Sequence, residues 1–134
     1  FVTQIQAAEQ SQNMYTSEYF ESDLVNSYAW DTAIVFLQEC DDRADKTKPY
    51  SRQNSLNTEF AEKGTNGTGT EDVICNIYDM ASNCYEWSTE TCSNASPCVF
   101  RGGNYRYSGY TSRRGGNYAT TSRGVDSFRP LLYL

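Results

Sequence analysis

The chain has 134 residues, enough for one domain, and 38% of them are hydrophobic, enough for a single core. Its longest apolar run, Ala33–Leu37, is far shorter than the roughly 20 residues of a membrane-spanning helix, so we expect no membrane insertion. The chain has no His, which removes the commonest general base and the commonest zinc ligand.

The formal net charge of −6 is unevenly distributed along the chain. Residues 1–100 hold every acid except Asp126, whereas all the basic residues of 101–134 are arginines. The negative total argues against nucleic acid as a partner, but these arginines allow a local basic face suited to bidentate recognition. Residues 102–127 draw 23 of their 26 positions from Gly, Tyr, Arg, Ser, Thr and Asn. Such a segment can bury little aliphatic surface, so we expect it at the surface.

Apolar residues at helical spacing predict two helices in the first part of the chain. The first covers residues 4–16, with Thr3 as its N-cap, and the second covers residues 26–39, with Asn26 as its N-cap. The polar, acidic stretch 17–23 between them predicts a loop.

The pattern changes to short β-type runs after residues 41–70, a polar stretch that predicts a long surface loop. Strands are expected at 75–78, 84–88, 98–101 and 128–133. Two helices followed by several short strands indicate an α+β domain. The side chains expected in its core are Trp30, Phe36, Ile77, Trp87, Phe100, Phe128 and Leu132.

Five cysteines are present, and an odd number leaves at least one of them unpaired within the chain. Cys92 and Cys98 flank a short loop that a disulfide could close, but both can equally be small, half-buried hydrophobic residues. No Cys-x-x-Cys pair occurs, which argues against a zinc site.

Three segments resemble, in the same order, the motifs of a known family. Residues 76–87 (N-I-Y-D-M-A-S-N-C-Y-E-W) resemble N-x-Y-D-M-x-G-N-V-W-E-W, residues 101–105 resemble R-G-G-S-[FYW], and residues 127–129 resemble a closing G-F-R. These motifs belong to the formylglycine-generating-enzyme (sulfatase-modifying-factor) domain family. The resemblance implies a single C-type-lectin-like domain over residues 1–134, an α+β fold of two helices, short twisted antiparallel sheets and long loops. It also implies that the first strands of that domain lie ahead of Phe1.

The departures from the family pattern concern its metal chemistry. In the family's enzymes, two copper-binding cysteines follow the R-G-G motif, and the matching positions here are Tyr107 and Ser112. Neither side chain can bind Cu(I) as a thiolate, so we expect no copper and no enzymatic activity. Asn83 and Glu86 match the family's calcium pattern, but they supply far fewer oxygen ligands than the roughly six to eight that calcium takes.

The composition of residues 102–127 resembles the variable proteins of diversity-generating retroelements, a branch of this family in which mutagenesis rewrites Asn codons. This resemblance implies a non-catalytic module on a bacterial cell surface or phage particle that binds a protein or glycan ligand on another cell or particle. Tyr, Ser, Gly and Arg are also the residues from which paratopes are built. We expect one contiguous exposed face in this segment, with Arg113 as a further cation beside it. The face is formed by Arg106, Tyr107, Ser108, Tyr110, Thr111, Ser112, Arg114, Asn117, Tyr118, Arg123, Val125 and Asp126.

Two other interpretations remain open. Arg101–Gly103 and Arg114–Gly116, with the Tyr residues between them, could form an RNA-binding Arg-Gly-Gly segment, although a hydrophobic strand at 128–134 then follows. The chain could also be an enzyme, either one of the family that has lost its copper cysteines or one of another kind, in which adjacent acids such as Asp41 and Asp42 or Glu71 and Asp72 serve as acid–base groups.

Overall fold

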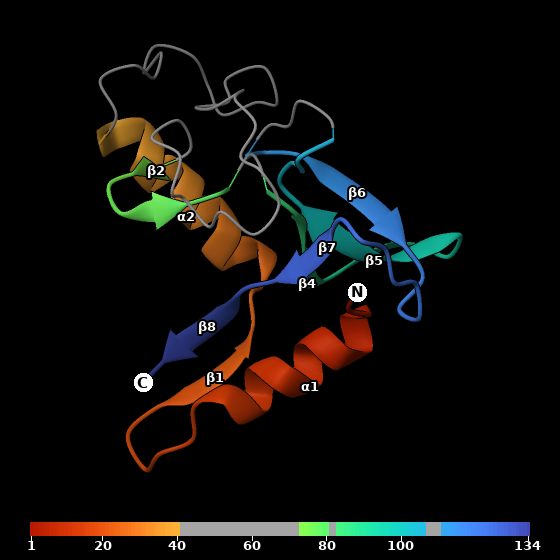
Figure 1. Cartoon of the computed structure of the whole chain (residues 1–134). Coiled ribbons are helices and arrows are strands. Elements are labelled where there is room, and N and C mark those ends of the chain that lie inside the picture. The colour runs from red at the N-terminus through yellow and green to blue at the C-terminus, as the bar shows by residue number, and fades with distance from the viewer. Residues whose placement is uncertain (41–72, 81–82, 107–110) are drawn as a thin grey trace.

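The computed structural model describes residues 1–40, 73–80, 83–106 and 111–134 (Figure 1). The described residues form two helices, α1 (Gln4–Met14) and α2 (Ser27–Cys40). They also form the strands β1 (Glu21–Leu24), β2 (Val73–Ile74), β3 (Ile77–Tyr78), β4 (Tyr85–Ser93), β5 (Ser96–Arg101), β6 (Arg114–Asn117), β7 (Asp126–Phe128) and β8 (Pro130–Tyr133). The loop expected at 41–70 lies outside the described residues.

The largest sheet of the described part has four strands in the order β6-β5-β4-β7. β4 runs parallel to β7, while β4–β5 and β5–β6 are antiparallel pairs. Two smaller antiparallel sheets pair β1 with β8 and β2 with β3. The fold is therefore a small α+β fold, as the order of the elements in the sequence predicts. Neither of the two described helices combines the length and the hydropathy needed to cross a membrane.

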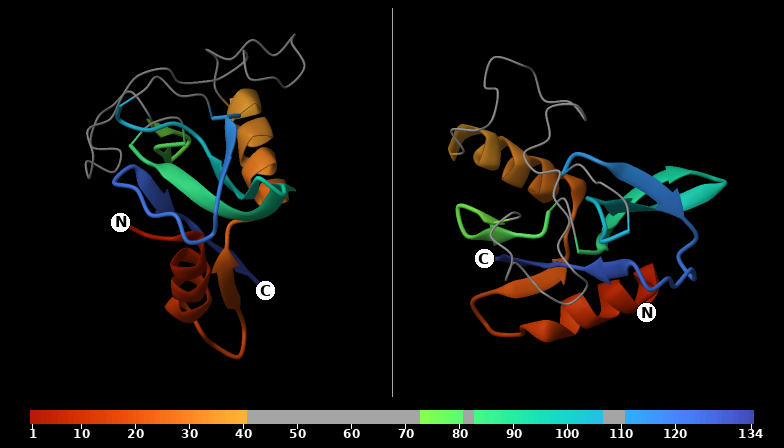
Figure 2. Two further views of the ribbon diagram at one scale, coloured as in Figure 1. Left: turned by 90° about the vertical axis from the view of Figure 1, so that its right-hand side faces the viewer. Right: turned by 45° about the horizontal axis from the view of Figure 1, so that its top comes forward.

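The two helices pack on opposite sides of the four-stranded sheet (Figure 2). On the α1 side, Ala7 belongs to one buried cluster with Trp87 of β4 and Phe100 of β5. On the α2 side, Trp30 and Ile34 belong to a second buried cluster, with Met80 and Leu37. The sheet supplies side chains to the first cluster, whereas the second cluster consists of α2 residues together with Val25 and Met80.

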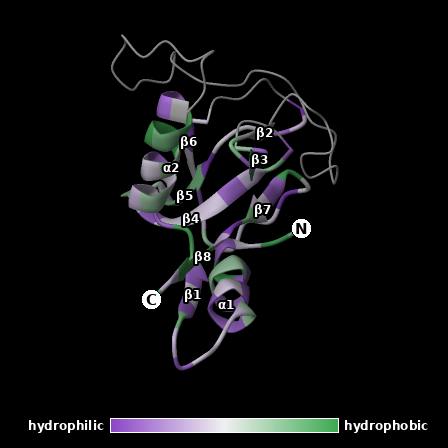
Figure 3. Ribbon diagram, turned by 90° about the vertical axis from the view of Figure 1, so that its left-hand side faces the viewer, coloured by the Kyte–Doolittle hydropathy of each residue, from purple (hydrophilic) through white to green (hydrophobic). Residues whose placement is uncertain are grey.

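Aromatic and polar side chains dominate the buried part of β4. This strand shows little of the hydrophobic colour in Figure 3, yet Tyr85, Glu86, Trp87 and Ser88 are all buried. Trp87 is 0% exposed, and its indole Nε1 donates a hydrogen bond to the carbonyl oxygen of Val2 at 3.1 Å. The prediction that Trp87 is a core residue is therefore confirmed, and the same holds for the buried Trp30 and Phe100.

Both predicted helix caps are present. The Thr3 hydroxyl accepts from the backbone N–H of Gln6 at 3.2 Å, and the Gln6 side chain accepts from the Thr3 N–H at 3.0 Å. The side-chain oxygen of Asn26 accepts from the N–H of Ala29 at 2.8 Å. The first helix ends at Met14, before the predicted residue 16, because Thr16 already pairs with Glu21 as an extended bridge.

Three predictions for the first part of the chain and for its end are wrong. The predicted loop 17–23 contains most of β1, a polar strand that buries only Ser22 and Leu24. Phe36 is 47% exposed because it lies about 200° around α2 from the buried Ile34. Leu132 is 52% exposed because β8 is the edge of a two-stranded sheet and has a partner on one side only in the described part. Ile77 and Phe128 are half-buried and pack against the two clusters.

Two of the predicted strands are divided differently in the structure. The run 75–78 contains only β3 and the turn before it, in which Cys75 and Asn76 take positive φ values of 49° and 63°, and β2 precedes this run as the other strand of the hairpin. The run 128–133 belongs to two strands, because β7 ends at Phe128 and β8 begins at Pro130.

Cys92 and Cys98 lie on the two strands of the β4–β5 hairpin and are free thiols. Cys98 is paired with Thr91, so Cys92 lies opposite Pro97 and the two cysteines point to opposite faces. Cys98 is buried and Cys92 is exposed. No disulfide closes this loop in the structure, and of the two cysteines only Cys98 is a small buried residue.

Candidate functional site

A cleft of about 550 Å³ opens over the α1-facing side of the four-stranded sheet. Its floor consists of the rings of Tyr85 and Phe100, whose centroids are 4.6 Å apart. Gly115 of β6 lies opposite Phe100, and a Cβ at this position would come within 2.4 Å of the Phe100 Cζ atom. The missing side chain therefore lets the Phe100 ring extend to β6. The lining residues are Tyr85, Phe100, Asn104, Arg106, Arg113, Arg123, Gly124 and Val125.

Three guanidinium groups surround this aromatic floor. The Cζ atom of Arg113 lies 4.9 Å from the centre of the Tyr85 ring, and that of Arg123 lies 4.6 Å from the centre of the Phe100 ring. Arg106 lies 5.5 Å from the ring of the neighbouring Tyr105. Such contacts hold the cations over the faces of the rings.

The positive charge of the cleft is only partly neutralised. Arg123 donates two hydrogen bonds to Asp126, from Nε to Oδ2 at 2.8 Å and from Nη2 to Oδ1 at 2.7 Å. Within the described residues, no carboxylate lies within ion-pair distance of Arg106 or Arg113. Two guanidinium groups therefore remain available to an anionic ligand.

A short hydrogen bond fixes the backbone on one wall of the cleft. The buried side chain of Asn104 accepts from the N–H of Arg106 at 2.7 Å. This bond closes a turn of the kind that Asn favours, and it places Arg106 at the rim of the cleft.

Arg114, the neighbour of Arg113, points to the opposite face of the sheet. It forms an ion pair with Glu90, which also accepts from the 1% exposed Arg101 at 3.4 Å. Arg101 itself is bound to Asp31 of α2. Arg113, the residue before β6, thus reaches the cleft, whereas Arg114, the first residue of β6, points to the α2 side.

The predicted single exposed face is wrong. Thr111 is buried because this segment turns back to α2, where the Thr111 carbonyl accepts from the Trp30 indole at 2.8 Å, and Ser112 is buried beside it. Asp126 is buried as the partner of Arg123, and Val125 is buried in the cluster under the cleft. The exposed members are Arg106, Arg114 and Tyr118, the half-buried ones are Asn117 and Arg123, and Tyr107, Ser108 and Tyr110 lie outside the described residues.

Sequence reasoning missed the floor of the cleft and the wall residue Asn104. The floor residues Tyr85 and Phe100 lie before the segment with the unusual composition, and the pairing of β4 with β5 brings them together. Asn104 lies near the start of that segment. The spacing of two residues between Tyr85 and Trp87 on β4 is the one sequence signal that places both rings on the same face of the sheet.

The two calcium candidates have other partners. Both carboxylate oxygens of Glu86 accept hydrogen bonds of 2.8 Å from Arg129, and the Asn83 amide donates to Asp79 at 3.1 Å. A cation at Glu86 would have to displace the Arg129 guanidinium. The described residues contain no group of three or more Cys, Asp or Glu side chains placed to hold a metal ion.

Searches of protein-family models, curated proteins and solved structures find no match to this chain.

Proposed function

We propose that the chain is a non-catalytic recognition module that binds an anionic group of a protein or glycan ligand in the basic, aromatic cleft. The observation that carries this proposal is the set of three guanidinium groups, from Arg106, Arg113 and Arg123, around the Tyr85 and Phe100 rings. Guanidinium binds carboxylate, sulfate and phosphate groups bidentately, and the rings add flat apolar contact area.

The division of the cleft between two parts of the chain supports a display role. All three arginines come from residues 102–127, whereas the aromatic floor comes from β4 and β5. A fixed floor with changeable side chains around it is what a variable protein of a diversity-generating retroelement requires. We therefore propose a C-type-lectin-like domain of that kind, on a bacterial cell surface or phage particle.

The RNA-binding alternative gains no support from the arginines of the two Arg-Gly-Gly triplets. Arg101 is buried and paired with Asp31 and Glu90, and Arg114 is paired with Glu90 as well. Guanidinium groups engaged in this way would have to leave their carboxylates before contacting a phosphate.

A fragment titration tests the proposal. Benzoate serves as an anionic aromatic probe and benzyl alcohol as its neutral counterpart, with binding followed by NMR shifts of the Tyr85 and Phe100 rings. We expect benzoate to bind more tightly than benzyl alcohol. Arg113→Gln should weaken the binding of benzoate about fivefold or more, because the carboxylate loses its contact with a partly exposed guanidinium group.

Arg114→Gln is the matched control, since it removes the same charge from the next residue on the opposite face. It should leave benzoate binding unchanged. Equal binding of benzyl alcohol, or equal effects of the two substitutions, would contradict the proposed anion site.

A further inference from the structure

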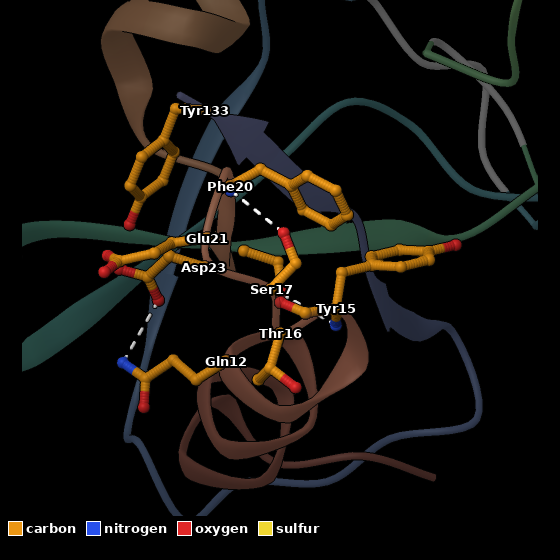
Figure 4. Close-up of a pocket in the computed structure, with 9 residues that line it drawn as sticks. Gln12, Tyr15, Thr16, Ser17, Phe20, Glu21, Asp23 and Tyr133 are labelled. Atoms are coloured by element: carbon orange, nitrogen blue, oxygen red, sulfur yellow. Dashed lines mark hydrogen bonds between the residues drawn. The ribbon is translucent and has the colours of Figure 1, made fainter.

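A second cavity, of about 380 Å³, is lined by the end of α1 and by residues of the β1–β8 sheet and of the segment before β1 (Figure 4). In Figure 1, α1, β1 and β8 lie at the other end of the molecule from β6. It shares no residue with the basic cleft. Its lining residues are Gln12, Tyr15, Thr16, Ser17, Phe20, Glu21, Ser22, Asp23 and Tyr133.

Three aromatic rings and two carboxylates meet in this cavity. Glu21 and Asp23 are two residues apart on β1, so their side chains point to the same face of the sheet. Tyr133 of β8 lies directly opposite Glu21 in the β1–β8 pair. Figure 4 shows Tyr133 beside the two carboxylates, and the rings of Tyr15 and Phe20 on the other side. Each ring is between a third and a half exposed.

The charge of the cavity is negative and uncompensated by its walls. The carboxylate of Asp23 is held by the Gln12 amide at 3.2 Å and by the N–H of Leu24 at 2.7 Å. The lining contains no Lys or Arg, and within the described residues no side chain pairs with the carboxylate of Glu21.

Hydrogen bonds fix the chain that carries the rings. The Ser17 hydroxyl accepts from the N–H groups of Tyr19 at 3.0 Å and Phe20 at 3.2 Å. The Ser22 hydroxyl accepts from the N–H of Tyr15 at 3.1 Å and donates to the carbonyl oxygen of Ser11 at 2.5 Å. Walls fixed in this way lose little conformational freedom when a ligand enters.

We infer that this cavity binds an organic cation, a group of the alkylammonium or guanidinium type. Ring faces attract such a cation through their quadrupoles, and the adjacent carboxylates add a full opposite charge. A metal ion fits less well, because the two carboxylates are far short of the oxygen ligands that a hard cation needs. A neighbouring cavity of about 320 Å³ shares Phe20, Glu21 and Tyr133 and adds Glu18, so the negative surface continues beyond the first cavity.

Two sources could supply this cation: a free small alkylammonium ion, or an Arg side chain of a protein. Choline tests the first, against its neutral isostere 3,3-dimethylbutan-1-ol. The peptide Gly-Gly-Arg-Gly-Gly, acetylated at its N-terminus and amidated at its C-terminus, tests the second, against the same capped peptide with citrulline in place of Arg. Ring shifts of Tyr15, Phe20 and Tyr133 report the binding. Tighter binding of choline or of the Arg peptide supports the inference, and the tighter of the two identifies the source. Binding of neither cation, or equal binding of the neutral compounds, overturns it.

Glu21→Gln isolates the charge without changing the shape of the cavity. We expect it to weaken binding of the preferred cation about fivefold or more. Glu9→Gln, an exposed acid on α1 outside the cavity, should leave the affinity unchanged. Equal affinity of the Glu21→Gln and unsubstituted proteins overturns the inference. Arg113→Gln should not affect this cation, so the two sites can fail independently.

Discussion

At the scale of single residues, backbone conformation explains one part of the Arg-Gly-Gly motif. Gly102 has a φ of +78°, and a Cβ there would lie 2.6 Å from the carbonyl oxygen of Met80. Its N–H donates to the carbonyl oxygen of Arg113 at 3.2 Å, which ties the end of β5 to the start of β6. The glycine at this position therefore serves the close approach of three chain segments.

Replacement of Gly102 tests this account. We expect Gly102→Ala to lower the free energy of unfolding by about 2 kcal/mol or more, because it combines a left-handed conformation with a backbone clash. Chemical denaturation measures the change. Gly124→Ala is the milder control, since its new Cβ would meet only the exposed Phe1 ring, at 3.3 Å. A smaller loss for Gly102→Ala than for Gly124→Ala would contradict the role assigned to Gly102.

The two cysteines of the β4–β5 hairpin should differ in reactivity. Burial raises the pKa of the Cys98 thiol above its usual 9.0, and the neighbouring Cys92 raises it further. Because the thiolate is the nucleophile, iodoacetamide at pH 8 should modify the exposed Cys92 about tenfold faster than Cys98. Peptide mass spectrometry gives both rates, and modification of Cys98 before Cys92 would contradict the assigned burial.

The same shift fixes the sign of a pH effect. Cys98 binds its proton more tightly in the folded chain than in the unfolded chain. Its contribution to stability is therefore complete below the usual thiol pKa and is lost as the pH rises through the higher folded-state value.

At the scale of elements, the sequence predicted the helices, whose formation depends on residues close together in the chain. The helices α1 and α2 follow from their apolar spacing and from the caps Thr3 and Asn26. The strands β1 and β6 escaped prediction because E-S-D-L and R-G-G-N contain almost none of the β-branched and aromatic residues that favour strands. Each forms only because a partner strand is present: β8 for β1, and β5 for β6.

At the scale of the whole molecule, composition located the basic segment but not the shape of the site. The arginines of the cleft could be foreseen from the change in composition at Arg101. Their division between the two faces of the sheet could not, because it depends on the register that sets Arg114 opposite Arg101 and Gly115 opposite Phe100. The acidic, aromatic cavity likewise needs the pairing of Glu21 with Tyr133, two residues at opposite ends of the chain.

The structure also separates residues that hold the fold from residues that are free to vary. Arg106, Arg113 and Tyr118 make no described hydrogen bond or ion pair through their side chains, whereas Asp126 is buried and accepts two hydrogen bonds from Arg123. We therefore expect the combined variant Arg106→Gln, Arg113→Gln, Tyr118→Ser to keep the free energy of unfolding within about 1 kcal/mol of the original.

Asp126→Asn should instead lower the free energy of unfolding by about 2 kcal/mol, since it weakens two charge-assisted bonds of a buried carboxylate. Thermal and chemical unfolding of the two variants, followed by circular dichroism, compares them directly. A module built for a changing binding surface must tolerate the triple substitution, because recognition and folding then depend on different side chains. If the triple variant unfolds more readily than Asp126→Asn, the cleft residues are structural and the display role fails.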